Sequence, residues 1–190
     1  MTGRAGGRDE PVRAFVALEI DAGARERLAE LIGGLRPLLP GARWVAASNL
    51  HLTLRFLGPS RPDALARIAL DLERAAAACP PCTAPMLALG TFPERGRPRV
   101  LWLDMALPEP ILALQSACER AAVAAGFERE PRPFRSHLTL ARFRDGGRAG
   151  PLPRPELGEA RLERVTLFRS ELRPQGPLYT ALGTFALGRG

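Results

Sequence analysis

The chain contains the tetrapeptide His-Leu-Thr-Leu twice, at residues 51–54 and 137–140, and these two copies hold its only histidines. In a β-strand successive side chains point to opposite faces, so each copy presents a histidine and a threonine on one face and two leucines on the other. A strand motif repeated in each half of a chain predicts two similar lobes. If the lobes pair about an approximate two-fold axis, the two polar faces meet across a cleft.

Alternating apolar patterns and turn residues divide the chain into strands and helices. Strands are expected at residues 12–20, 42–46, 49–57, 83–92, 100–105, 136–143, 161–172 and 178–187. Helices are expected at residues 24–35 after an Asp21 cap, from Pro62 onward after Ser60, and at 109–125. The interspersed hairpins predict an α+β fold of two pseudo-symmetric lobes, with antiparallel sheets facing the cleft and helices outside.

A chain of 190 residues is long enough for one domain with a substantial core. Residues 1–10 lack the apolar segment of a secretory signal, so we expect a disordered lead-in there and a single bilobal domain over 11–190. No stretch approaches the roughly 18 consecutive apolar residues that a membrane helix needs. The sequence therefore predicts a cytoplasmic protein that does not contact membranes, and we expect a monomer.

The charge of the chain favours an anionic partner. All 27 basic residues are arginines, and the formal net charge at pH 7 is +7. Such an excess of positive charge is typical of proteins that bind nucleic acid or phosphate esters. The lack of lysine by itself fits the codon bias of a GC-rich genome equally well, but that bias does not account for the net charge.

The three cysteines, Cys79, Cys82 and Cys118, argue against a disulfide framework because their number is odd and no secretion signal precedes them. Cys79 and Cys82 have the spacing of a redox or metal motif, but they follow an alanine-rich run at the expected end of a helix. A redox cysteine pair instead opens a helix, where the helix dipole lowers the thiol pKa. A zinc site would also lack ligands, so neither function is expected here.

The imidazoles and hydroxyls of the repeated motif suit phosphoester chemistry. An imidazole accepts or donates a proton near neutral pH. Cleavage of a cyclic phosphate needs a base for water and an acid for the departing ribose oxygen. We therefore predict His51 and His137 as the catalytic pair, with the Thr53 and Thr139 hydroxyls on the non-bridging phosphate oxygens. The pattern alone does not say which histidine is the acid, and no metal or cofactor is expected.

Arginine is expected to supply positive charge to the phosphate, because a guanidinium matches phosphate geometry in a bidentate manner. Candidates on either side of the second motif are Arg129, Arg132, Arg135, Arg142 and Arg144. Arg142, five residues after His137, is the strongest of them. On an ideal strand an odd offset faces away from His137, so this role requires a bulge, a strand end or a long side chain that curls round.

With these motifs the sequence resembles the two-histidine (HxTx) phosphoesterases, and specifically the bacterial and archaeal RNA 2′,3′-cyclic phosphodiesterases, also called 2′-5′ RNA ligases. The resemblance extends from about residue 12 to residue 187. It rests on the segments RAFVALEI, NLHLTLRFLG, VLWLD and RPFRSHLTLAR. It implies a bilobal α+β fold with the site between the lobes.

The resemblance also implies a role for each site residue. His51 would donate a proton to the leaving ribose oxygen, and His137 would be the base that activates water. Thr53 and Thr139 would bind the phosphate, and Arg142 would stabilise its developing charge. The expected substrate is RNA with a 2′,3′-cyclic phosphate end or a small cyclic nucleotide, and the expected product carries a 2′-phosphate.

Other functions remain open from the sequence. The same site could act as a 2′-5′ RNA ligase or on another cyclic or 2′-5′-linked nucleotide. A non-catalytic RNA-binding module is a further alternative, although RNA binding does not require two matched histidines. Aromatic residues that could stack on a base or pack in the core are Phe15, Trp44, Phe56, Trp102, Phe134 and Tyr179.

Overall fold

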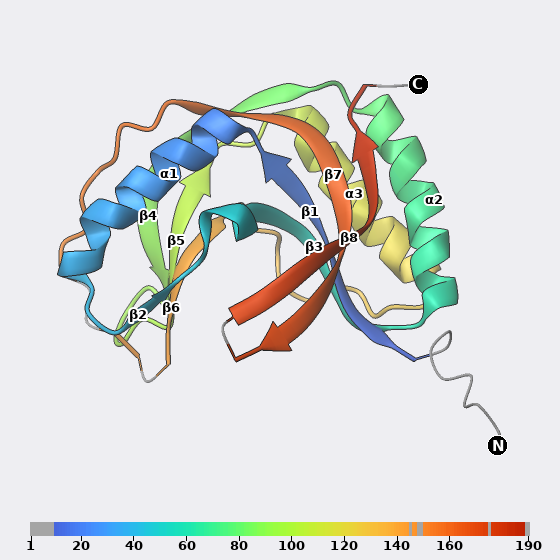
Figure 1. The fold of residues 1–190 in the computed structure, drawn as a ribbon. Coiled ribbons are helices and arrows are strands. Elements are labelled where there is room, and N and C mark those ends of the chain that lie inside the picture. Colours follow the sequence, from blue (N-terminus) through green and yellow to red (C-terminus); the bar gives the residue numbers. More distant parts are fainter. Residues whose placement is uncertain (1–9, 145, 148–149, 175, 189–190) are drawn as a thin grey trace, which may run out of the picture.

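The computed structural model describes residues 10–144, 146–147, 150–174 and 176–188 (Figure 1). Of the lead-in expected over residues 1–10, all but Glu10 lies outside the described residues. Within the described part of the chain, no helix is long and apolar enough to cross a membrane.

The elements follow the predicted order, with shifts of a few residues at their ends. The strands are β1 (Val12–Ile20), β2 (Ala42–Trp44), β3 (His51–Ser60), β4 (Cys82–Phe92), β5 (Val100–Met105), β6 (Leu138–Phe143), β7 (Glu159–Arg173) and β8 (Gly176–Ala186). The helices are α1 (Ala22–Leu35), α2 (Pro62–Ala78) and α3 (Glu109–Ala124), with short 3-10 turns at Arg36–Leu38 and Ala47–Asn49.

Local chemistry explains where two helices begin. The Asp21 carboxylate accepts a hydrogen bond from the Ala24 amide at 3.0 Å, which caps α1 as predicted. Pro62 occupies the first turn of α2, but Ser60 belongs to β3 and Arg61 is the residue that precedes the helix. The strand expected over 42–46 ends at Trp44, because the chain turns into the 3-10 segment before β3.

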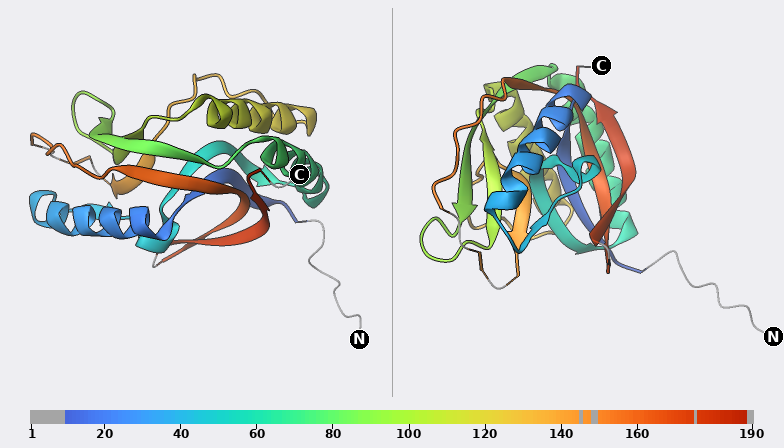
Figure 2. Two further views of the ribbon diagram at one scale, coloured as in Figure 1. Left: turned by 90° about the horizontal axis from the view of Figure 1, so that it is seen from above. Right: turned by 60° about the vertical axis from the view of Figure 1, so that its left-hand side comes forward.

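All strand pairings are antiparallel, which confirms the predicted fold class. The strand order is β1-β3-β6-β5-β4-β7-β8, with β2 on β6 and an additional pairing between β1 and β7. One lobe contains β1, β3, β7 and β8, and the other contains β2, β4, β5 and β6. Seen from above, the strands lie between α1 on one side and the packed pair α2 and α3 on the other (Figure 2).

The two lobes join where β4 pairs with β7 and, through the repeated motif, where β3 pairs with β6. Strands β3 and β6 pair at Leu52 and Leu138, which lie directly opposite each other. Both leucines are fully buried, and so are Leu54 and Leu140 to within a few per cent. The leucines of both copies therefore belong to the core, and the histidines and threonines occupy the opposite face of the sheet.

Candidate functional site

The register of β3 and β6 brings the two polar faces together. Leu52 is paired with Leu138 in an antiparallel ladder. Continuing that ladder by one residue in each direction places His51 beside Thr139 and His137 beside Thr53. The four polar side chains are half-buried. We call this surface, made by His51, Thr53, His137, Thr139 and Arg142, the histidine face.

The two imidazoles are held in the same way. His51 Nδ1 lies 2.6 Å from the carbonyl oxygen of Asn49, and His137 Nδ1 lies 2.8 Å from that of Arg135. A carbonyl can only accept, so Nδ1 carries the hydrogen in both rings. Nε2 of each neutral ring is then left with its lone pair, which makes it a base when unprotonated and an acid when protonated.

Aromatic rings surround His51. Its ring centroid lies 4.9 Å from that of Phe15, 5.3 Å from that of Tyr179 and 6.4 Å from that of Phe168. Burial lowers the pKa of His51, and the positive charges of Arg142 and His137 lower it further, against the opposing effect of the Asn49 carbonyl. The unliganded protein therefore holds His51 mainly in its neutral form at pH 7.

His137 lies against a different aromatic group. Its ring meets that of Phe92 edge-on at 5.3 Å, and Phe92 packs on Trp102 at 5.1 Å. The Arg135 guanidinium lies over Trp102 at 4.5 Å and is paired with Glu94. A Cβ on Gly90, the cross-strand partner of Trp102, would overlap the indole ring, so this position requires glycine.

A bulge in β6 turns Arg142 onto the histidine face. Leu101 of β5 pairs with Ala141, but the next residue, Trp102, pairs with Thr139, so Leu140 is an extra residue. The alternation of faces is reversed after this point: Leu140 and Ala141 are both buried and Arg142 is exposed. The odd offset from His137 therefore does not turn Arg142 away, and its charge acts on both His51 and Tyr179.

The first copy of the motif has a matching bulge. Val16 of β1 pairs with Arg55 and Ala17 pairs with Thr53, which leaves Leu54 as the extra residue. Phe56, five residues after its histidine, thus occupies the position in this lobe that Arg142 occupies in the other. Its side chain is 54% exposed.

Among the other aromatic candidates, Trp102 is buried, and Trp44 and Phe134 pack against the core.

The charge of Arg142 leads to a prediction about the titration of His51. We expect NMR titration of the imidazole protons to give His51 a pKa below the usual 6.5. Arg142→Gln should raise that pKa, because it removes a positive charge that disfavours the imidazolium. A His51 pKa that stays the same or falls in Arg142→Gln would contradict this placement of the guanidinium.

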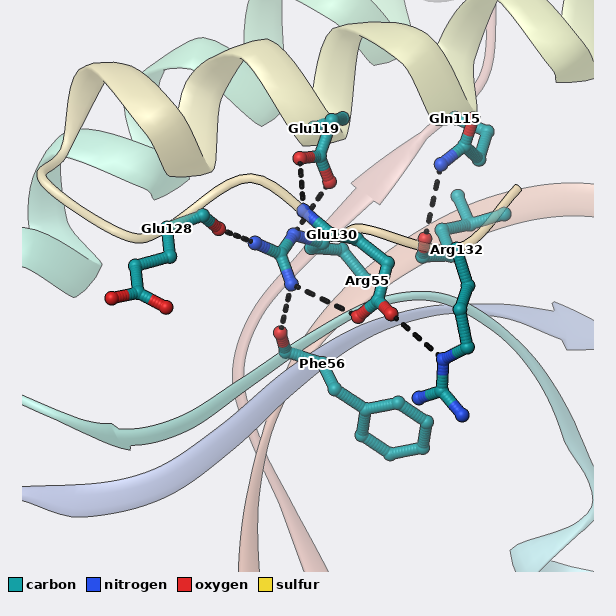
Figure 3. A network of polar contacts seen from close by, with 8 residues as sticks. Arg55, Phe56, Gln115, Glu119, Glu128, Glu130 and Arg132 are labelled. Carbon is teal, nitrogen blue, oxygen red and sulfur yellow. Dashed lines mark hydrogen bonds and ion pairs between the residues drawn. The ribbon is translucent and has the colours of Figure 1, made fainter. Parts of the chain in front are cut away.

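Arg55, which the sequence pattern does not single out, is buried at 8% exposure between β3 and α3 (Figure 3). Its Nε pairs with Glu119 of α3 at 2.6 Å, and its Nη1 lies 3.8 Å from Glu130. The same guanidinium donates to the carbonyl oxygens of Phe56, at 2.7 Å, and Glu128. It therefore ties the bulged strand to α3 and to the segment that leads to the second motif.

Replacing Arg55 with Met should lower the free energy of unfolding by about 3–5 kcal/mol, because it leaves the buried charge of Glu119 without its cationic partner and removes the donor to two carbonyls. Denaturant unfolding followed by circular dichroism measures this change. Arg67→Met is the matched control: Arg67 pairs with Asp63 on the exposed side of α2, and its loss should cost no more than about 0.5 kcal/mol. Equal losses in the two variants would contradict the assigned role of Arg55.

Burial raises the pKa of the Cys79 thiol to about 11 and that of Cys118 to about 12. Both groups therefore stay protonated near neutral pH, and a protonated thiol is a poor nucleophile and metal ligand. In the part of the chain that the structure describes, no three His, Cys, Asp or Glu side chains are grouped as a metal site would require.

Comparison with known proteins points to one family. A model of the family described as LigT-like phosphoesterase matches residues 18–102 and again residues 103–179, so each match contains one copy of the tetrapeptide. A curated protein of Methanothermobacter thermautotrophicus named RNA 2′,3′-cyclic phosphodiesterase is 33% identical, over 93% of this chain and 99% of its own. A protein of the same name from Thermus thermophilus is 35% identical, over 93% of this chain and 90% of its own.

Solved structures agree with these relatives. A protein of Thermus thermophilus superposes with a TM-score of 0.82 at 32% identity, covering 93% of this chain and 98% of its own. Escherichia coli LigT in complex with 3′-AMP gives a TM-score of 0.80 at 30% identity, with the same two coverages. The two-lobed arrangement described above is therefore that of these structures.

Proposed function

Because this chain belongs to the LigT-like phosphoesterases and is an enzyme of the RNA 2′,3′-cyclic phosphodiesterase kind, we propose that it opens 2′,3′-cyclic phosphate ends of RNA by general acid–base catalysis between His51 and His137. The product carries a 2′-phosphate. The observation that carries this proposal is the pair of matched imidazoles, each with Nδ1 on a main-chain carbonyl and Nε2 free for proton transfer.

In the proposed reaction His137 Nε2 takes a proton from water as the water oxygen attacks phosphorus. The bond between phosphorus and the ribose 3′ oxygen breaks, and His51 Nε2 gives its proton to that oxygen. Each transfer contributes a factor of about 10² to 10⁴ to the rate. Exchange with solvent then returns His137 to its neutral form and His51 to its protonated form. The two-fold placement of the histidines suits one base and one acid, because the water attacks and the ribose oxygen departs on opposite sides of phosphorus.

The neighbouring groups support the same reaction. The Thr53 and Thr139 hydroxyls, each beside the histidine of the other copy, donate to non-bridging phosphate oxygens and hold phosphorus in line. Arg142 stabilises the negative charge that develops on those oxygens. The bound phosphate is also an anion next to His51, so its arrival raises the pKa of His51 and supplies the protonated acid that burial disfavours in the free enzyme.

The site is assembled within one chain, since His51 and Thr53 lie on β3, Thr139 lies on β6 and His137 directly precedes β6. We therefore propose that residues 11–190 act as a single bilobal unit and as a monomer. No metal or cofactor takes part in the proposed steps, because the two imidazoles supply every proton transfer and Arg142 supplies the charge.

Phosphorus NMR with adenosine 2′,3′-cyclic phosphate and excess EDTA tests the proposed function. We expect conversion to adenosine 2′-monophosphate at the rate seen without EDTA. Formation of the 3′-monophosphate would contradict the assigned leaving group, and loss of turnover with EDTA would contradict a metal-independent reaction. A cyclic phosphate that stays intact, both as the nucleoside and at the end of a short RNA, would favour ligation, another nucleotide or RNA binding alone.

A further inference from the structure

Arg43 of β2 and Arg142 of β6 form a pair of like charges within the sheet. They lie directly opposite each other in the antiparallel ladder between these strands. Residues that face each other in this way share one face of a sheet, so Arg43 lies on the same side as Arg142. Both side chains are exposed, and neither is paired with an acidic side chain within the described residues.

Two positive charges in this arrangement destabilise a sheet unless an anion lies between them. The bulge in β6 puts Arg142 on the histidine face, where its charge lowers the pKa of His51 and where the proposed function places the reacting phosphate. Arg43 lies on the other strand of the pair. Arg142 is three residues beyond Thr139 on β6, so this pair is about 10 Å from the centre of the motif along the strand. The charge of Arg43 is thus placed beyond the reacting phosphate.

We propose that Arg43, on the strand beside Arg142, forms a second phosphate subsite that binds the phosphodiester joining the terminal nucleotide of an RNA to the one before it. The inference rests on the proposed function, since it takes the cyclic phosphate to lie between the histidines. Bidentate guanidinium groups suit a phosphodiester. Contacts to the RNA phosphate backbone add affinity whatever the base sequence. The subsite therefore favours an RNA of two or more nucleotides over a single nucleoside cyclic phosphate.

A comparison of two substrates tests the subsite. Adenosine 2′,3′-cyclic phosphate has no second phosphate, whereas the dinucleotide ApA with a 2′,3′-cyclic end has one. Arg43→Gln should lower kcat/KM for the dinucleotide about tenfold, mainly through KM, and change that for the nucleoside less than about twofold. The salt dependence of the dinucleotide reaction should also become shallower by roughly 0.7 in the log–log slope. The control is Arg74→Gln, an exposed arginine of α2 that should change neither substrate.

An equal fall on both substrates, or no fall on the dinucleotide, would overturn the subsite. Binding gives the same comparison without turnover. Calorimetry on His137→Ala and on its double variant with Arg43→Gln should show about tenfold weaker binding of the dinucleotide and no change for the nucleoside. If the wild-type protein hydrolyses neither substrate, the proposed function fails, and this binding difference still decides whether the subsite exists.

Discussion

His137→Ala is expected to lower kcat for a 2′,3′-cyclic phosphate by about 10² to 10⁴, with a much smaller change in KM. The imidazole is the proposed base for water, and the other imidazole on the histidine face, His51, is assigned to the acid. His51→Ala should cause a loss of the same order, because the ribose oxygen would then depart without a proton. Steady-state rates measured by separation of the cyclic and opened nucleotides give both values.

Both histidines are half-buried at the surface of the sheet, so the alanine variants should keep the fold. Far-ultraviolet circular dichroism and the unfolding temperature of each variant check this point. The pH dependence of kcat/KM in the wild-type protein should be bell-shaped, since one group must be unprotonated and the other protonated. A folded His137→Ala protein within tenfold of the wild-type rate would contradict the mechanism.

Arg142→Gln is expected to lower kcat by about 10² to 10³, the usual cost of removing one group aimed at developing charge. Arg142→Lys should restore part of the rate, because it keeps the charge but loses the bidentate geometry. Arg74→Gln on α2 provides the control for loss of one positive charge at a distant position. If Arg142→Gln changed the rate no more than this control, the proposed role of Arg142 in stabilising the developing charge would be contradicted.

The periodicity of the sequence predicts the two faces of each motif, and the structure has the leucines inside as expected. It does not predict the direction of Arg142, because a bulge is a property of strand pairing and only appears in the register with β5. A signal was present: the apolar residues Leu140 and Ala141 stand next to each other and interrupt the alternation. In the first copy the two consecutive buried residues are Leu54 and Arg55. Because Arg55 is charged, the sequence still looks alternating there and gives no sign of the bulge.

Long-range pairing explains the other omissions. Arg55 is a charged residue in a strand, and its partners Glu119 and Glu130 lie far along the chain, on α3 and after it. Local pattern gives no indication of such a network. The pairing of Arg43 with Arg142 likewise depends on β2 joining β6, strands separated by almost a hundred positions in the printed sequence. Residue chemistry predicts the candidates, and only the fold shows which of them meet.

The proton donated to the departing oxygen is the most specific claim of this account. It is tested most directly with a 2′,3′-cyclic phosphate in which sulfur replaces the 3′ oxygen, because a thiolate leaves without protonation. We predict that this substrate restores His51→Ala to within about tenfold of the wild-type rate and leaves His137→Ala impaired. Rescue of His137→Ala instead, or of neither variant, would contradict the assignment of His51 as the acid and His137 as the base.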